Sequence, residues 1–370
     1  MSKIKDIMKR ICGLVPLSNR IMFESLPDLT DSSKAIFDEM VRRGLNRRYK
    51  MVWNCHSKDF SSYPEIDNVK YINEEDHPLL MKWLIFSSKC FITTNSFMYS
   101  KRKGQSSIYI SHGGPIKDCG GYYTLPEEVD YLITLGGEAS KPTADTLHFP
   151  FDRTYALGYP RNDDILRNHV DLRSLFGNYK KFIIWYPTFR NVKEGMTACT
   201  HDFPIVHDKS ALIELNNSLE SLNTLIVLKP HFAQSVTDFE SMSNIKVIHD
   251  DFFTSHSISP YSFIGSFDAL LTDYSSVYYD YLLCDKPIGM IWEDIEEYKT
   301  KPGLVDGFEH LSRGGEKIYN IHELLLFIKD ISEGKDNSAR VRQEVMRDVH
   351  GENKICTPSV VDFIIEKAGL

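Results

Sequence analysis

Paired cysteines are missing from this sequence. Its 7 cysteines are scattered over 370 residues, and no two of them form a C-x-x-C motif. Disulfide-rich scaffolds and structural zinc sites need regularly spaced cysteines, so the pattern argues against both. We therefore expect a cytoplasmic protein with reduced thiols and no metal site of its own.

Long apolar runs are missing too. No stretch approaches the roughly 18 apolar residues of a membrane-spanning helix, and the N-terminus lacks the pattern of a signal peptide. Residues 1–20 instead surround an apolar helical face with basic side chains. Two interpretations stay open. The segment is either a first helix packed on the body or an interfacial helix on an anionic membrane surface, which would make the protein peripheral at the inner face of the cell membrane.

Several catalytic motifs are absent as well. The chain has no G-x-x-x-x-G-K-[ST], no G-x-G-x-x-G after its first strand, no G-x-S-x-G, no H-E-x-x-H and no D-x-D. These absences argue against P-loop nucleotidases, dinucleotide dehydrogenases, α/β serine hydrolases and zinc proteases. The missing D-x-D also removes the metal–diphosphate clamp of many sugar-nucleotide transferases. The sequence thus requires no cofactor, and a role for Mg²⁺ stays open.

The sequence also lacks an excess of positive charge. Lysine and arginine total 43 against 51 aspartates and glutamates, a formal net charge of −8. General nucleic-acid binders need a broad basic face, so nucleic acid is not an expected partner.

What the sequence does contain is an alternation of short apolar runs with helical stretches. Two series of runs predict buried strands: 20–23, 51–53, 90–93, 107–110, 131–134 and 155–157, then 182–186, 225–228, 246–248, 269–272 and 288–291. Several lack polar alternation, which indicates parallel sheets covered on both faces. We expect an α/β protein with two Rossmann-like domains facing across a cleft.

The expected domains follow from a break between the two series. Residues 164–179 are polar and have little strand character, so we place the boundary there. The N-terminal domain is expected over 21–165 and the C-terminal domain over 180–340. Residues 341–370 read as a charged, helical tail.

In open α/β sheets, ligands bind beyond the carboxyl ends of the strands. After 107–110 comes Ser-His-Gly-Gly-Pro-Ile-Lys, in which His112 can act as a general base. Gly113 and Gly114 would let a ligand approach the chain closely. The alternative is a turn whose histidine caps a helix.

Hydroxyls follow another strand. After 269–272 the chain reads Asp273-Tyr-Ser275-Ser276, and Asp280 stands one helical turn further on. Serine hydroxyls and free N–H groups at a helix start form an anion site. Plain helix capping is the other interpretation, and the two are compatible.

Cations follow further strands. Lys229 and His231 come after 225–228, and Arg190 comes after 182–186, where its guanidinium can bind phosphate oxygens. Arg161 and Asn162 lie in the Gly-Tyr-Pro-Arg-Asn-Asp turn that closes the first series. A structural role for His231 and a linker role for this turn stay open.

Taken in order, these blocks resemble the CDP-glycerol:poly(glycerophosphate) glycerophosphotransferases, which build teichoic acids and related capsular polymers. K-R-K-G-Q at 101–105 and H-G-G-P-I-K at 112–117 resemble that family's K-R-x-G-Q…W-H-G-T-P-L-K. G-Y-P-R-N-D at 158–163, Y-P-T-F-R at 186–190 and K-P-H at 229–231 resemble further family blocks. L-T-D-Y-S-S at 271–276, followed by Asp280 and K-P at 286–287, completes the series.

The resemblance implies a GT-B-like enzyme that transfers a polyol phosphate from a CDP-linked donor and releases CMP. Glycerol phosphate is the expected group, and the acceptor is a hydroxyl of a lipid-linked saccharide or a growing polymer. His112 inherits the role of general base, and His231 a role at the donor phosphates. The donor side would further include Thr188, Arg190, Lys229, Asp273, Ser275, Ser276 and Asp280. The acceptor side would include Gly113, Gly114, Lys117, Arg161 and Asn162.

One departure from the family pattern matters. Ser-His-Gly-Gly stands where the family has Trp-His-Gly-Thr, so Gly114 replaces a hydroxyl residue. An idle binding or scaffold protein therefore stays open. So do a GT-B nucleotide-sugar glycosyltransferase or epimerase and a CDP-ribitol ribitolphosphotransferase.

Overall fold

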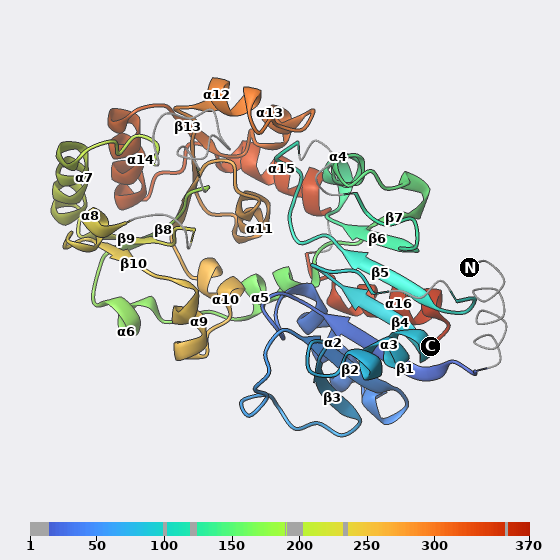
Figure 1. Cartoon of the computed structure of the whole chain (residues 1–370). Helices are drawn as coiled ribbons and strands as arrows, with labels where there is room; N and C mark the ends of the chain where they lie inside the picture. Colours follow the sequence, from blue (N-terminus) through green and yellow to red (C-terminus); the bar gives the residue numbers. More distant parts are fainter. Residues whose placement is uncertain are drawn as a thin grey trace.

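The computed structural model describes residues 15–98, 102–118, 124–188, 190, 203–231, 236–351 and 354–370. Within them the chain forms two parallel sheets with helices packed around each (Figure 1). Every strand predicted from an apolar run is present, and the expected pair of Rossmann-like domains is confirmed.

The first sheet has the strand order β3-β2-β1-β4-β5-β6-β7. Its strands are β1 (Ser18–Glu24), β2 (Lys50–Cys55), β3 (Val69–Asn73), β4 (Ser88–Thr93), β5 (Ser106–Ile110), β6 (Tyr131–Thr134) and β7 (Thr154–Ala156). Its helices are α2 (Asp31–Arg42), α3 (Pro78–Ser87), α4 (Ser140–Thr146) and α5 (Asp163–Arg167), with 3₁₀ turns η1 (Leu45–Arg47), η2 (Gly137–Ala139), η3 (Phe151–Arg153) and η4 (Pro160–Asn162).

The second sheet has the order β10-β9-β8-β11-β12-β13. Its strands are β8 (Lys181–Tyr186), β9 (Thr224–Leu228), β10 (Ile245–Val247), β11 (Ala269–Thr272), β12 (Ile288–Ile291) and β13 (Glu316–Ile318). Its helices are α6 (Leu172–Phe176), α7 (Lys209–Ser221), α8 (Thr237–Glu240), α9 (Asp250–His256), α10 (Pro260–Gly265), α11 (Val277–Tyr281), α12 (Ile295–Thr300), α13 (Phe308–Leu311) and α14 (Ile321–Glu333), with the 3₁₀ turn η5 (Leu282–Cys284).

Strand order reverses once in each sheet, and this positions the site. The chain winds outward from β1 in one direction and returns to add β4 on its other side; β8 and β11 repeat the pattern. A crevice opens where the order reverses, at the carboxyl ends of the strands. The loops after β1, β4, β8 and β11 are therefore the places for ligand-binding residues.

The last two helices join the domains. Helix α15 (Ala339–His350) packs against η5 of the C-terminal domain and against η2 of the N-terminal domain. Helix α16 (Thr357–Ala368) then lies beside the first sheet, where Val360, Val361 and Ile364 are fully buried (Figure 1). Asp163 fixes its start, because its carboxylate accepts from the backbone N–H groups of Cys356 and Thr357 at 2.8 and 3.1 Å.

The N-terminal segment lies largely outside the described residues. The helix predicted over 1–20 falls on residues 1–14 for most of its length, and the structure describes the chain from residue 15. Its last residues, from Ser18, belong to strand β1 instead. No helix in the described part of the chain is both long enough and apolar enough to cross a bilayer.

Candidate active site

His112 follows β5 and is oriented by groups of its own domain. Its Nδ1 lies 3.3 Å from the carbonyl oxygen of Thr94 and 3.3 Å from the hydroxyl of Tyr109. Because a carbonyl oxygen only accepts, the contact with Thr94 is a hydrogen bond when Nδ1 carries the proton. That tautomer leaves a lone pair on Nε2, which is what a general base needs.

The protonation state of His112 suits this role. The ring reaches solvent, but the protein around it displaces much of the water. Burial lowers the pKa of His112 below the ordinary 6.5, and the nearby Arg161 charge lowers it further. Asp31 and Glu24 oppose this shift without reversing it. The imidazole is therefore neutral at pH 7.

The two glycines after His112 bring its loop against the other domain. A Cβ at Gly113 would lie 2.9 Å from Oγ of Ser276, and one at Gly114 would lie 2.2 Å from the ring of Tyr279. The Tyr279 hydroxyl also donates to the carbonyl oxygen of Pro115 at 2.8 Å. A side chain does not fit at Gly114, so glycine permits this contact. The structure thus places His112 and Ser276 at one junction.

The predicted anion site around Ser275 and Ser276 has less helix behind it than expected. Helix α11 has only five residues before it tightens into η5, so its dipole is short. The Ser276 side chain makes no capping hydrogen bond to the described backbone. Its hydroxyl, rather than a helix dipole, would contribute most to anion binding there.

Asp280 points away from solvent and toward the N-terminal domain. Its carboxylate accepts from Asn162 Nδ2 at 2.8 Å and from Arg161 Nη2 at 3.1 Å. All three side chains are buried. The structure therefore brings together one residue predicted for the donor side and two predicted for the acceptor side.

Lys117, Lys229 and His231 gather at the other end of the His112 loop. Residues 117 and 118 pair with the loop at 303–304 of the C-terminal domain. Burial lowers the pKa of His231, and the charges of Lys229 and Lys117 lower it further, so both cations are close to the ring. Lys229 Nζ also lies 2.7 Å from Asp250. Among the described residues, these two lysines are candidates for contact with the predicted pyrophosphate.

Arg190, Asp273 and Thr188 form a separate buried network. The Arg190 guanidinium lies 2.7 Å from the carboxylate of Asp273 and 2.7 Å from that of Asp294. The Thr188 N–H donates to Asp273 at 2.9 Å. Arg190 is only 1% exposed, so this network lies inside the protein. It connects the loop after β8 to the loop after β11. Direct donor contacts of these residues stay a prediction.

Sequence reasoning missed Glu24, which lies at the end of β1. Its side chain is fully buried, and Oε2 accepts from the N–H groups of Asn95 and Ser96 at 3.2 and 3.0 Å. These bonds fix the turn that begins at Thr94, whose carbonyl oxygen orients His112. A carboxylate in the last position of an apolar strand was the available signal.

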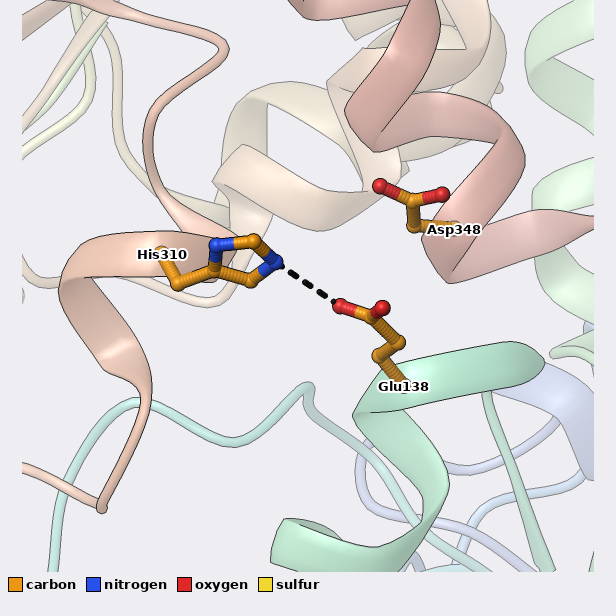
Figure 2. A group of neighbouring side chains, drawn as sticks. All are labelled: Glu138, His310 and Asp348. Atoms are coloured by element: carbon orange, nitrogen blue, oxygen red, sulfur yellow. Dashed lines mark hydrogen bonds and ion pairs between the residues drawn. The ribbon is translucent and has the colours of Figure 1, made fainter.

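A polar cluster joins the domains away from His112. Figure 2 shows His310 of α13 and Glu138 of η2 pointing toward one another, with 3.0 Å between Nε2 and Oε2, and Asp348 of α15 nearby. Among the described residues, this is the one group with a donor set for a divalent ion. Its members are substantially exposed, and Arg313 already pairs with Asp348 at 2.6 Å. We interpret the cluster as a contact between domains.

Comparison with known families gives a match over nearly the whole chain. The family model described as CDP-Glycerol:Poly(glycerophosphate) glycerophosphotransferase matches residues 7–364. A teichoic acid poly(glycerol phosphate) polymerase of Bacillus spizizenii is 24% identical over 344 residues, 84% of each chain. A teichoic acid glycerol-phosphate transferase of Staphylococcus aureus is 23% identical over 331 residues, 78% of each chain.

Comparison with solved structures gives the same fold. The wall teichoic acid polymerase TagF matches with a TM-score of 0.72 at 19% identity, over 99% of this chain and 96% of that chain. The fold is therefore GT-B-like, as expected.

Proposed function

The chain belongs to the CDP-glycerol:poly(glycerophosphate) glycerophosphotransferase family, and on that premise we propose that it transfers glycerol phosphate from CDP-glycerol to a hydroxyl of a teichoic-acid or capsule precursor. The observation that carries the proposal is the contact of Gly113 with Ser276, which joins the loop of a neutral imidazole to a hydroxyl-bearing turn of the other domain. The acceptor is either a lipid-linked saccharide or the growing polymer.

The reaction follows from the two sides of this junction. The acceptor hydroxyl attacks the phosphorus that bears the glycerol, and Nε2 of His112 takes its proton. A new oxygen–phosphorus bond forms, and the bond from that phosphorus to the oxygen of CMP breaks. CMP leaves with the electron pair and a developing negative charge.

Protein cations meet the charge that develops on the donor. Lys117 and Lys229 supply positive charge beside the His231 imidazole, and His231 and the Ser276 hydroxyl add hydrogen-bonding groups. Phosphoryl transfer depends mainly on alignment and charge stabilisation, so such groups can do much of the work.

A protein-bound Mg²⁺ does not fit the carboxylates near this junction. Mg²⁺ prefers oxygen ligands that are not already neutralised by a protein cation. Asp273 and Asp294 pair with Arg190, and Asp280 pairs with Arg161. These carboxylates are therefore not expected to hold a metal during the reaction.

A membrane surface is the second partner that we propose. Leu79 and Trp83 of α3 are 81% and 50% exposed, although both are large and apolar, and Lys82 lies beside them. The described chain starts next to this helix, since Arg102 donates to the carbonyl groups of both Val15 and Phe86. The described chain, which the basic, amphipathic sequence of residues 1–14 precedes, therefore begins beside an exposed apolar helix. This combination favours peripheral binding to an anionic cytoplasmic leaflet.

The donor reaction is tested by replacing the base. With CDP-glycerol and an acceptor saccharide, the His112→Ala enzyme should lose about 10²- to 10⁴-fold in kcat for CMP release, the usual worth of a histidine base. The exposed His322 on α14 supplies a matched control, and His322→Ala should keep full activity. Because the pKa of His112 is lowered, wild-type kcat/KM should stay level down to pH 6.5 and fall only below it.

Comparing donors identifies the substrate. CDP-glycerol, CDP-ribitol and UDP-sugars are compared, with mass spectrometry of the product. Release of UDP with sugar transfer, or full turnover by folded His112→Ala enzyme, would contradict the proposal.

A further inference from the structure

We propose that Arg161 is a positioning residue for the reaction: it holds the His112 loop of the N-terminal domain against α11 of the C-terminal domain. It would thereby keep the imidazole and the Ser276 hydroxyl in one relative position. This inference rests on the proposed function, because that function gives His112 its role as the base.

The Arg161 guanidinium joins three segments that are far apart in the sequence. Nη1 donates to the carbonyl oxygen of His112 at 2.6 Å and to the carboxylate of Asp31 at 2.8 Å. Nη2 donates to the carboxylate of Asp280 at 3.1 Å. One planar group therefore binds the backbone of the proposed base, the start of α2 and the C-terminal domain.

Neighbouring residues of the same turn strengthen the attachment. The Tyr159 hydroxyl donates to the carbonyl oxygen of Gly113 at 2.8 Å, and Asn162 donates to Asp280. The rings of Tyr159 and Tyr261 each lie 5.1 Å from the guanidinium carbon, one ring from each domain. The turn at 159–162 thus binds the His112 loop at two successive carbonyl groups.

Burial argues for this role over direct contact with the acceptor. Arg161 is 5% exposed, and its two terminal nitrogens both donate to protein oxygens. Burial disfavours its charge, but the carboxylates of Asp280 and Asp31 outweigh burial and raise its pKa. A guanidinium enclosed in this way would have to leave its partners before it could bind a substrate.

Loss of the Arg161 guanidinium should displace His112 without removing its imidazole. Arg161→Lys keeps the charge but cannot bind the His112 carbonyl, Asp31 and Asp280 in the same plane. Misplacement of a reacting group by about 1 Å can cost roughly 100-fold in rate. We therefore expect a large loss in kcat and a small change in the donor KM.

The chain offers a matched control in Arg342. This arginine is 1% exposed and lies 2.6 and 3.1 Å from Asp336 and Asp285, so it is an equally buried arginine between two carboxylates. Its partners all lie in the C-terminal domain or α15. Arg342→Lys should lower the melting temperature comparably and leave kcat within about twofold.

The experiment measures CMP release from CDP-glycerol and the rate at which diethyl pyrocarbonate modifies His112, mapped by peptide mass spectrometry. Arg161→Lys should lower kcat about 100-fold and change the His112 modification rate, whereas Arg342→Lys should change neither. If Arg161→Lys is poorly folded, the isosteric Asp280→Asn enzyme replaces it, with the same expectation.

Two outcomes would overturn the inference. One is a His112 modification rate in both Arg161→Lys and Asp280→Asn that equals wild type. The other is a rise in acceptor KM with kcat unchanged, which would make Arg161 an acceptor contact. If wild-type enzyme releases no CMP from any donor, the proposed function fails, while the modification rates still decide whether Arg161 positions His112.

Discussion

At the scale of single residues, Gly114 and Tyr279 share one space at the domain junction. They stand 165 positions apart, yet the Tyr279 ring fills the volume that a side chain at 114 would occupy. The family pattern that this chain resembles has threonine where Gly114 stands. At this departure the Tyr279 ring occupies the space, and the His112 loop is closely packed.

The effects of substituting Gly114 and Tyr279 on stability and on kcat should be strongly coupled. Gly114→Ala alone should destabilise the protein by about 1–3 kcal/mol through overpacking and lower kcat, because the His112 loop must move. Combining it with Tyr279→Ala should restore part of the loss, giving a coupling energy of about 0.5–3 kcal/mol. Thermal unfolding and CMP release measure both quantities.

The control for this cycle is Tyr279→Phe, which removes only the hydrogen bond to Pro115. Combined with Gly114→Ala, it should leave the loss unrelieved. Strict additivity of Gly114→Ala and Tyr279→Ala would mean that the two residues do not share the space.

Sequence reasoning identified candidate site residues that would face a ligand, but not the residues that hold them in position. His112 and Ser276 were predictable because a histidine and hydroxyls directly after buried strands face the ligand edge of the sheet. Asp31 was not, because it reads as an ordinary carboxylate at the start of a helix, and the only signal for Glu24 was a carboxylate at the end of an apolar strand. Their importance comes from contacts with Arg161 and the Thr94 turn, which depend on packing between distant segments.

At the scale of elements, some strands could likewise be predicted from the sequence and others could not. Apolar runs predicted the buried strands well, because continuous burial leaves a continuous apolar sequence. The two strands that were missed, β3 and β13, are short edge strands. Val69–Asn73 is half exposed, and Glu316–Ile318 has only three residues, so neither shows a clear apolar period.

The exposed apolar side chains of helix α3 should contribute to membrane binding. Replacing both Leu79 and Trp83 by serine should weaken binding to phosphatidylglycerol-containing vesicles by about tenfold or more. Partial burial of two large apolar side chains would supply at least the roughly 1.4 kcal/mol that a tenfold change requires. Activity on a water-soluble acceptor should be unchanged. Sedimentation with vesicles measures the binding.

A matched control lies on the other domain. Leu326 of α14 is also apolar and is 56% exposed, and Leu326→Ser should not alter sedimentation. Equal sedimentation of the α3 double variant and wild type would assign the exposed apolar face to something other than a membrane. Equal binding to vesicles of phosphatidylcholine alone would remove the anionic lipid from the proposal.

At the scale of the whole molecule, one hydrophobic core reaches through both domains. Ile21 and Trp53 of the first sheet belong to the same buried cluster as Ile184 and Leu270 of the second. Residues of α15 and α16, among them Ile364, belong to it too. A core shared in this way should make the two domains unfold together.

The expectation is a single cooperative transition. Ile364→Ala should cost about 2–5 kcal/mol, the usual range for an isoleucine truncated in a core. Hydrogen exchange should show that strands of both sheets lose protection together, although the substitution touches only the first domain. Selective loss of protection in β1 and β4, with β8 and β11 unchanged, would mean that the domains unfold independently.

The return of α16 to the first sheet matters for anyone who wishes to recombine this enzyme with its relatives. The N-terminal domain is built from strands β1–β7 with their helices and from α16, and the C-terminal domain lies between them in the sequence. A hybrid made with one crossover near residue 179 would pair a foreign α16 with the native α2 and β5. An exchange of C-terminal domains therefore needs two crossovers, the second between α15 and α16, so that the N-terminal domain keeps its own α16.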